Sequence, residues 1–157
     1  MNRPSHDLYF SHIAAVVATR SACHRRHVGC VLTDSNNQIL STGYNGAARG
    51  VKNCESGCLR DLVESGTYLD SCYAIHAEVN ALLQCAETRL IHTCYVTASP
   101  CISCLKMLMN THCQRIVFIN VYPHPLSQQL WESMGREWIH LRTDSQFTIS
   151  LETMRQI

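Results

Sequence analysis

Two short stretches carry the residue types best suited to chemistry: His-Ala-Glu at positions 76–78 and Pro-Cys-Ile-Ser-Cys at positions 100–104. One imidazole and two thiolates are suitable ligands for a zinc ion, and three protein ligands leave the fourth position for water. Zinc lowers the pKa of bound water from about 15.7 to about 7, which provides a nucleophile at neutral pH. Glu78 is not needed as a ligand, so we assign it the proton transfers of a hydrolytic reaction. The predicted ligands of this catalytic zinc are His76, Cys101 and Cys104.

A structural zinc site is the alternative interpretation of the same residues. Structural sites usually have four protein ligands, whereas these two stretches supply three. A glutamate two residues from the histidine has no role in such a site. The pattern therefore favours catalysis.

The local sequence around both stretches predicts the helix starts that would position the ligands. In a helical first turn, Cys101 and Cys104 lie three residues apart on one face, and both sulfurs can reach one metal. Pro100 suits a helix start because its missing N–H has no partner there in any case. The apolar residues after His76 predict a second helix, so two positive helix ends would face the metal and favour thiolate and hydroxide.

Hydrophobic periodicity predicts the remaining elements. Leu8, Ile13, Val16 and Val17 predict a core-covering helix. A turn at 34–37 would join the first two strands into a hairpin. We expect helices at 7–21, from 76, at 101–112 and at 126–134, and strands at 28–33, 38–42, 93–98, 115–120 and 138–141. Alternating strands and helices indicate an α/β fold with a sheet covered on both faces, formed by a single domain over residues 1–157.

The cysteines outside the first site have two interpretations. Cys54, Cys58 and Cys72 have a spacing typical of structural zinc, with Cys23 as the most plausible fourth ligand. Buried free cysteine is the alternative, because cysteine packs readily as a small apolar residue. The cysteines assigned to the core are Cys30, Cys85, Cys94 and Cys113.

Composition excludes some classes of partner. The net charge is +1 and only 16% of residues are charged, which argues against a large polynucleotide-binding surface. There is no apolar signal segment or membrane span, so we expect no membrane partner. The ten cysteines then indicate reduced thiols in a cytoplasmic setting, which would be the host cytoplasm for a virus-encoded chain.

Two loops could contact a ligand. The basic loop from Ser21 to His27 would suit a phosphate, although a solvated run of charges is equally plausible. The glycine-rich loop from Gly43 to Gly50 allows close approach of a ligand to the backbone, and Asn45 offers both a donor and an acceptor. The alternative is that Asn45 and Gly46 only form a tight turn, since Asn-Gly pairs are common in turns.

With these residues in view, the chain resembles the deoxycytidylate (dCMP) deaminase family of the zinc cytidine-deaminase-like superfamily. The signature His-x-Glu followed by Pro-Cys-x-x-Cys is typical of zinc nucleobase deaminases. The sequences Val28-Gly29-Cys30, Gly43-Tyr44-Asn45-Gly46 and Ile75 to Ala81, with Tyr122, carry the narrower resemblance. The residues between the hairpin and the helix after His76, with Cys54, Cys58 and Cys72, resemble the extra cysteine-rich zinc site of the bacterial and phage branch of the family. The fold this implies is three-layer α/β/α with a five-stranded mixed sheet.

The resemblance implies roles for further residues. Glu78 would shuttle protons while dCMP is hydrolysed to dUMP. The implied substrate-binding residues are Asn45 for deoxyribose and base, Tyr122 for stacking, Arg25 for the 5′-phosphate, and Ala77 and Ser99.

Regulation is also implied by the resemblance. The family is typically a homohexamer, activated by dCTP and inhibited by dTTP with a divalent ion, here Mg²⁺, at a separate site. The implied effector residues are Gly43, Tyr44, Gly46 and Arg26. Ala48 stands where the family usually has proline, which is a departure in this loop.

Three other functions share parts of this pattern. A tRNA adenosine deaminase shares both zinc stretches but would need a basic groove for RNA. A free-nucleoside or guanine deaminase would not depend on a phosphate. A catalytically silent nucleotide sensor would have no need for Glu78.

Overall fold

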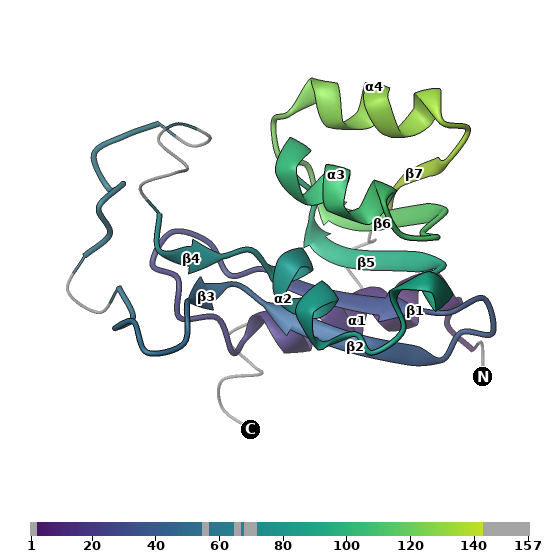
Figure 1. Ribbon diagram of the computed structural model, residues 1–157, viewed down its shortest axis with the longest axis horizontal. Coiled ribbons are helices and arrows are strands. Elements are labelled where there is room, and N and C mark those ends of the chain that lie inside the picture. The colour runs from purple at the N-terminus through teal and green to yellow at the C-terminus, as the bar shows by residue number, and fades with distance from the viewer. Residues whose placement is uncertain (1–2, 55–56, 65–66, 68–71, 143–157) are drawn as a thin grey trace.

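The protein is built on a mixed five-stranded sheet. The computed structural model describes residues 3–54, 57–64, 67 and 72–142 (Figure 1). The strand order is β2-β1-β5-β6-β7, with antiparallel pairing from β2 to β5 and parallel pairing from β5 to β7. These strands are β1 (Gly29–Thr33), β2 (Ile39–Tyr44), β5 (Thr93–Ala98), β6 (Arg115–Asn120) and β7 (Glu137–His140). The predicted five-stranded mixed sheet is confirmed.

Helices cover both faces of this sheet, as predicted. They are α1 (His6–Ala18), α2 (Ala77–Gln84), α3 (Ile102–Met109) and α4 (Pro125–Ser133), with a 3₁₀ turn η2 (Thr88–Leu90). Helix α1 packs on one face, and α2, α3 and α4 lie on the other (Figure 1). Alternate residues of the central strands enter two different cores, which is why β1 and β5 are buried along their whole length.

The face that helix α1 presents to the sheet matches the predicted one only in part, since Ile13 and Val17 pack against the core as expected. Phe10, Ala14 and Ala18 are buried, whereas Val16, which we expected in the core, is 47% exposed. The reason lies on β1: a Cβ at Gly29 would stand 2.0 Å from the backbone oxygen of Ala14. The glycine lets the small side chains of α1 approach the strand closely, and this selects the buried face.

The second strand is longer than expected and continues into what we predicted to be a glycine-rich loop. Gly43 pairs with Cys30 inside the sheet, and a Cβ at Gly43 would stand 2.3 Å from the backbone oxygen of Ala77 in α2. The close packing of α2 on β2 therefore explains why position 43 is a glycine. The loop begins only after Tyr44.

A second, two-stranded sheet follows, which the sequence did not predict. Its strands are β3 (Gly46–Ala47) and β4 (Ala74–Ile75), paired antiparallel. The described parts of the intervening segment, residues 48–73, extend away from the main sheet (Figure 1). We call residues 48–73 the cysteine-rich segment because they include Cys54, Cys58 and Cys72.

The other element boundaries differ from the predictions by a few residues at helix ends. Helix α1 ends at Ala18 and not at residue 21, and α3 covers Ile102–Met109 within the predicted 101–112. Strands β5 and β6 have the predicted bounds. Among the described residues, no helix has the length and apolar character needed to cross a bilayer.

Candidate metal centre and its cavity

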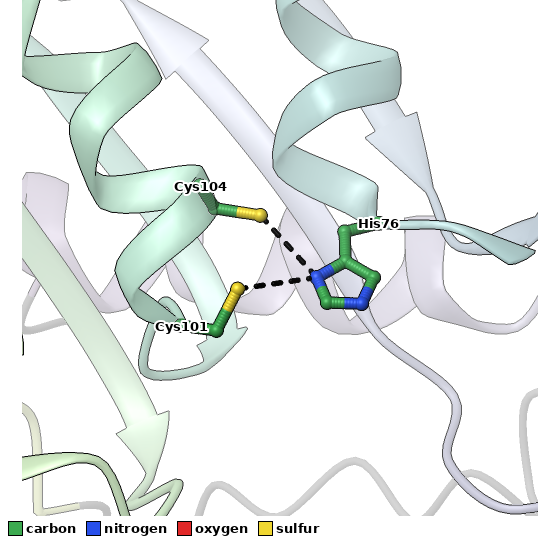
Figure 2. Close-up of side chains that lie close together, drawn as sticks. All are labelled: His76, Cys101 and Cys104. Carbon is green, nitrogen blue, oxygen red and sulfur yellow. Dashed lines mark hydrogen bonds between the residues drawn. The ribbon is translucent and has the colours of Figure 1, made fainter. Parts of the chain in front are cut away.

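The three predicted zinc ligands converge in space. The Nδ1 atom of His76 lies 3.5 Å from Sγ of Cys101 and 3.3 Å from Sγ of Cys104. All three ligand atoms lie within 4.8 Å of one another, and Figure 2 shows the three side chains pointing toward a common point. The cysteines are buried and the histidine is half-buried.

Two helix starts hold these side chains, as the local sequence predicted. His76 is the N-cap of α2 and Cys101 is the N-cap of α3, and both have extended backbone angles. Cys104 follows on the first turn of α3 (Figure 2). Because β5 ends at Ala98, the sheet places the start of α3 at the carboxyl end of a central strand, where α/β proteins commonly form their sites.

The donor set fits a zinc ion. An imidazole nitrogen and two sulfurs within one cluster form a combination that zinc prefers. Hydrogen bonds from Cys104 and His76 lower the pKa of Cys101, so a thiolate is accessible at neutral pH. With three protein ligands and an adjoining cavity, the arrangement corresponds to an open zinc site and differs from a closed structural one.

Glu78 lies in the first turn of α2, beside this cluster. Its side chain is 4% exposed, and it lines the same cavity as His76 and Cys101. Burial raises the pKa of Glu78 to about 7. A carboxyl group with a pKa near the operating pH can both accept and donate a proton, which is the property expected of a general acid/base.

The cavity next to the cluster has a volume of about 240 Å³. Its lining includes every substrate-binding residue that we predicted: Arg25, Asn45, Ala77, Ser99 and Tyr122. The structure therefore brings these residues together with the metal cluster. It also adds Arg26 and Arg60 to the lining.

Arg25 and Arg26 differ in how they are held. Both terminal nitrogens of Arg25 donate to backbone carbonyls of the cysteine-rich segment, one to Arg60 and the other to Val63 at 3.0 Å. Arg26, which we had assigned to a separate effector site, lies with its guanidinium 5.1 Å from the ring centre of Tyr122. The structure thus places Arg26 at the candidate active cavity and gives Arg25 a bracing contact.

Asn45 makes structural hydrogen bonds within the protein in addition to the ligand contact that we predicted. Its Oδ1 accepts hydrogen bonds from Ser21 Oγ at 2.6 Å and Val28 N at 2.8 Å. Its Nδ2 donates to the Arg26 carbonyl at 2.8 Å. One N–H remains for a ligand, so Asn45 fixes the basic loop against the end of β2 while lining the cavity.

Ser99 and Tyr122 are tied to each other beyond the carboxyl ends of β5 and β6. Ser99 Oγ accepts a hydrogen bond from Tyr122 N at 2.7 Å, and Ser99 is 5% exposed. This contact fixes the backbone that carries the Tyr122 ring. Ala77 is buried at the start of α2.

The cysteines assigned to a second zinc lie near one another. Burial, followed by the neighbouring thiols of Cys58, Cys23 and Cys72, raises the pKa of Cys54. Cys23, Cys58 and Cys72 also line the cavity. Their ligand atoms do not meet the spacing of the His76 cluster, which is the one such group among the described residues. The four cysteines assigned to the core are confirmed as buried: Cys30, Cys85, Cys94 and Cys113.

The residues predicted to contact an effector differ in their access to solvent. Tyr44 and Gly46 lie at the end of β2 and in β3, and Tyr44 is exposed. Gly43 is covered by α2 and has no comparable access.

Arg60 is the cavity residue that sequence reasoning missed. Nothing near it in the sequence marks it, because its place in the cavity depends on contacts with residues distant in the sequence, such as Arg25. It could have been found only from the three-dimensional structure.

Comparison with known proteins gives the context of this site. Residues 4–120 match the family described as the cytidine and deoxycytidylate deaminase zinc-binding region. A deoxycytidylate deaminase of Schizosaccharomyces pombe is 39% identical over 125 residues, which are 76% of this chain and 38% of that protein. One from Mycobacterium phage D29 is 38% identical over 125 residues, covering 75% of this chain and 97% of the relative.

The fold has counterparts among solved structures. The dCMP deaminase of cyanophage S-TIM5, solved in complex with dCMP and dUMP, superposes with a TM-score of 0.70 at 23% identity. The match covers 90% of this chain and 100% of that one. The aligned part of the chain spans less than two fifths of the yeast relative and nearly the whole of the mycobacteriophage one.

Proposed function

Because the chain belongs to the cytidine and deoxycytidylate deaminase zinc-binding family, we propose that it catalyses the hydrolytic deamination of dCMP to dUMP. The observation that carries this proposal is one cavity lined by His76, Cys101, Glu78 and arginine side chains. His76 and Cys101 supply metal ligands and Glu78 supplies a group for proton transfer. The arginines supply a positive region for a phosphate. Relatives named deoxycytidylate deaminase in a yeast and a phage support the choice of substrate.

His76, Cys101 and Cys104 would hold the zinc ion, which when bound supplies Lewis-acid activation of water. Glu78 performs the proton transfers. Its carboxylate accepts a proton from the attacking water and passes it to N3 of cytosine, which makes C4 more electrophilic. The water oxygen bonds to C4, and Glu78 carries the second proton from the resulting hydroxyl group to the amino group at C4. The C4–N bond then breaks, ammonia departs, and a carbonyl group remains at C4. The balance is dCMP plus water giving dUMP plus ammonia.

Tyr122 and Arg26 form the side of the cavity suited to the nucleotide. The cation–π contact between them presents an aromatic face beside a positive charge, a combination suited to a base or sugar next to a phosphate. Asn45 offers its remaining N–H to the sugar, and the backbone of Ala77 and Ser99 completes the base pocket.

The cysteines Cys23, Cys54, Cys58 and Cys72 would hold a second, structural zinc. The spacing of Cys54, Cys58 and Cys72 supports this, as does the position of Cys23, Cys58 and Cys72 in the wall of one cavity. Regulation by dCTP and by dTTP with Mg²⁺, through the region of Tyr44 and Gly46, and assembly into a homohexamer complete the proposal. We propose no polynucleotide partner.

The direct test is ammonia release from dCMP, deoxycytidine, dCTP and a tRNA anticodon stem-loop, each with and without added dCTP or dTTP. Turnover of dCMP, raised by dCTP and lowered by dTTP, is the expected result. Turnover of the RNA in its place would identify a tRNA adenosine deaminase. Nucleotide binding without ammonia release would identify a silent sensor.

A further inference from the structure

We propose that Arg60, on the cysteine-rich segment, is a specificity-determining residue that binds the 5′-phosphate of the nucleotide. The inference rests on the proposed function, since it names the group that would select a nucleotide over a nucleoside. It assigns to the cysteine-rich segment a direct part in substrate recognition.

The surroundings of Arg60 are unusual for a cation. The residue is only 9% exposed and lines the cavity that contains His76 and Glu78. The ion pairs between described residues involve Arg115 with Asp7 and with Glu137, and none involves Arg60. A buried charge is costly unless it is paired and hydrogen-bonded. No described carboxylate pairs with Arg60, and an anionic ligand in the cavity would supply such a partner.

The donors of Arg60 are only partly used within the chain. Its Nε donates to the carbonyl of Thr67 at 3.0 Å. Between described residues, no hydrogen bond involves either terminal nitrogen. Because a guanidinium has five N–H donors in a fixed fork, four remain, and they match the geometry of a phosphate.

The backbone of Arg60 is fixed on both sides. Its N–H donates to Sγ of Cys58 at 3.4 Å, and its carbonyl accepts a hydrogen bond from Arg25. The Cys58 N–H in turn donates to Asp61 at 2.7 Å. Arg25 therefore acts as a positioning residue, which differs from the direct phosphate contact that we first predicted for it.

The charge distribution of the cavity supports the same ligand. Of the described residues that line it, three are arginines and one, Glu78, carries a carboxylate. Arg25 and Arg26 are exposed at the surface, whereas Arg60 is buried. Burial lowers the effective dielectric, so an interaction with Arg60 is screened less than one with the exposed pair.

The test compares ligands that differ only in the phosphate. Binding of dUMP and deoxyuridine to wild type and to Arg60→Gln is measured by calorimetry, together with steady-state deamination of dCMP and the zinc content of each protein. We expect about a 10- to 100-fold loss of dUMP affinity, the size of a lost charge-assisted hydrogen bond. Deoxyuridine affinity and zinc content should not change, and the loss in deamination should fall on KM more than on kcat.

Arg49→Gln is the matched control, because Arg49 is an exposed arginine on the same segment and is absent from the cavity lining. Arg60→Lys should recover part of the dUMP affinity by restoring the charge. Unchanged dUMP affinity in Arg60→Gln, an equal loss for both ligands, or a loss of zinc would overturn the assignment and indicate a structural role. Wild-type protein that binds dUMP through Arg60 but releases no ammonia from dCMP would instead overturn the proposed reaction alone.

Discussion

At the scale of single residues, the proposed chemistry depends on a carboxyl group kept close to, but separate from, the three candidate metal ligands. Glu78 is buried in the cavity wall while His76, two residues earlier, points its Nδ1 at the two sulfurs. The division of work follows from this arrangement. Under the proposed function, His76 and the two cysteines hold the ion, and Glu78 moves protons.

Replacing Glu78 by glutamine is expected to abolish most turnover while leaving the metal bound. The amide keeps the shape of the side chain but cannot carry a proton between water and base. Loss of general acid/base catalysis typically lowers the rate by about 10²- to 10⁴-fold. Ammonia release from dCMP and zinc content measured on the same preparation test this. Near wild-type turnover would contradict the assignment.

Asn45 provides a second prediction at this scale. Its side chain makes three hydrogen bonds that join the basic loop to the end of β2. Removing them in Asn45→Ala leaves buried groups without partners and should lower the free energy of unfolding by about 2–4 kcal/mol. Urea denaturation of the ligand-free protein measures this. Unchanged stability would show that Asn45 serves only the substrate.

At the scale of elements, the site depends on how closely α2 lies on β2. Gly43 faces the backbone of Ala77 and Ala81, which would stand 2.3 Å from an added Cβ. A methyl group there must displace α2, the helix that begins at His76 and carries Glu78. The strand residue thereby controls the position of His76 and Glu78, which lie far along the chain.

We therefore expect Gly43→Ala to lower stability by about 1–3 kcal/mol through overpacking, and to reduce activity by moving the start of α2. Gly46→Ala is the structural control, because an added Cβ at Gly46 meets nothing within 4 Å. Thermal denaturation of both variants makes the comparison. Equal melting temperatures for the two would disprove the close packing of α2.

The contact between α1 and the sheet gives a pH-dependent prediction. Tyr95 Oη donates to Asp7 at 3.0 Å, and burial, with the nearby charge of Asp7, raises the pKa of Tyr95 to about 12. An unfolded tyrosine has a pKa of about 10. Between these values the unfolded chain releases a proton that the native protein retains, so stability falls as the pH rises.

Tyr95→Phe removes this titration along with one hydrogen bond. The variant should be less stable than wild type at a pH of about 8, by about 1 kcal/mol, and the difference should shrink as the pH rises toward about 11. Melting temperatures at intervals across this range measure the convergence. A constant difference would show that Tyr95 does not titrate differently in the two states.

At the scale of the whole molecule, the cysteine-rich segment forms part of the wall of the cavity next to the His76 cluster. Cys23, Cys58 and Cys72 line the cavity together with Arg60, and Arg25 links the basic loop to the carbonyls of the segment. Under our proposal, a second zinc would stabilise this arrangement from outside the catalytic cluster.

Replacing Cys54 by serine should accordingly reduce the zinc content from about two ions per chain to about one. Because structural zinc contributes to folding, the cysteine-rich segment should become more sensitive to protease, while the His76 cluster keeps its ion. Metal analysis combined with limited proteolysis tests this. Cys85→Ser is the control, since Cys85 belongs to the apolar core. A wild-type content of one zinc would exclude the second site.

The sequence alone determined the features that depend on residues close together in the chain. The types and spacing of His76, Cys101 and Cys104 predicted the candidate metal cluster, with Glu78 beside it, because helix geometry converts short spacings into shared faces. Strand periodicity predicted β5 and β6 to the residue. These features need only neighbouring residues to specify them.

Only the tertiary structure decided the features that depend on contacts between distant segments. The buried face of α1 was set by Gly29, the extension of β2 by its packing against α2, and the bracing role of Arg25 by carbonyls of a distant segment. Arg60 carries no local sequence signal, and its place in the cavity depends on contacts with residues distant in the sequence, such as Arg25. Such contacts are fixed by close packing and hydrogen-bond pairing across the molecule, which local periodicity does not encode.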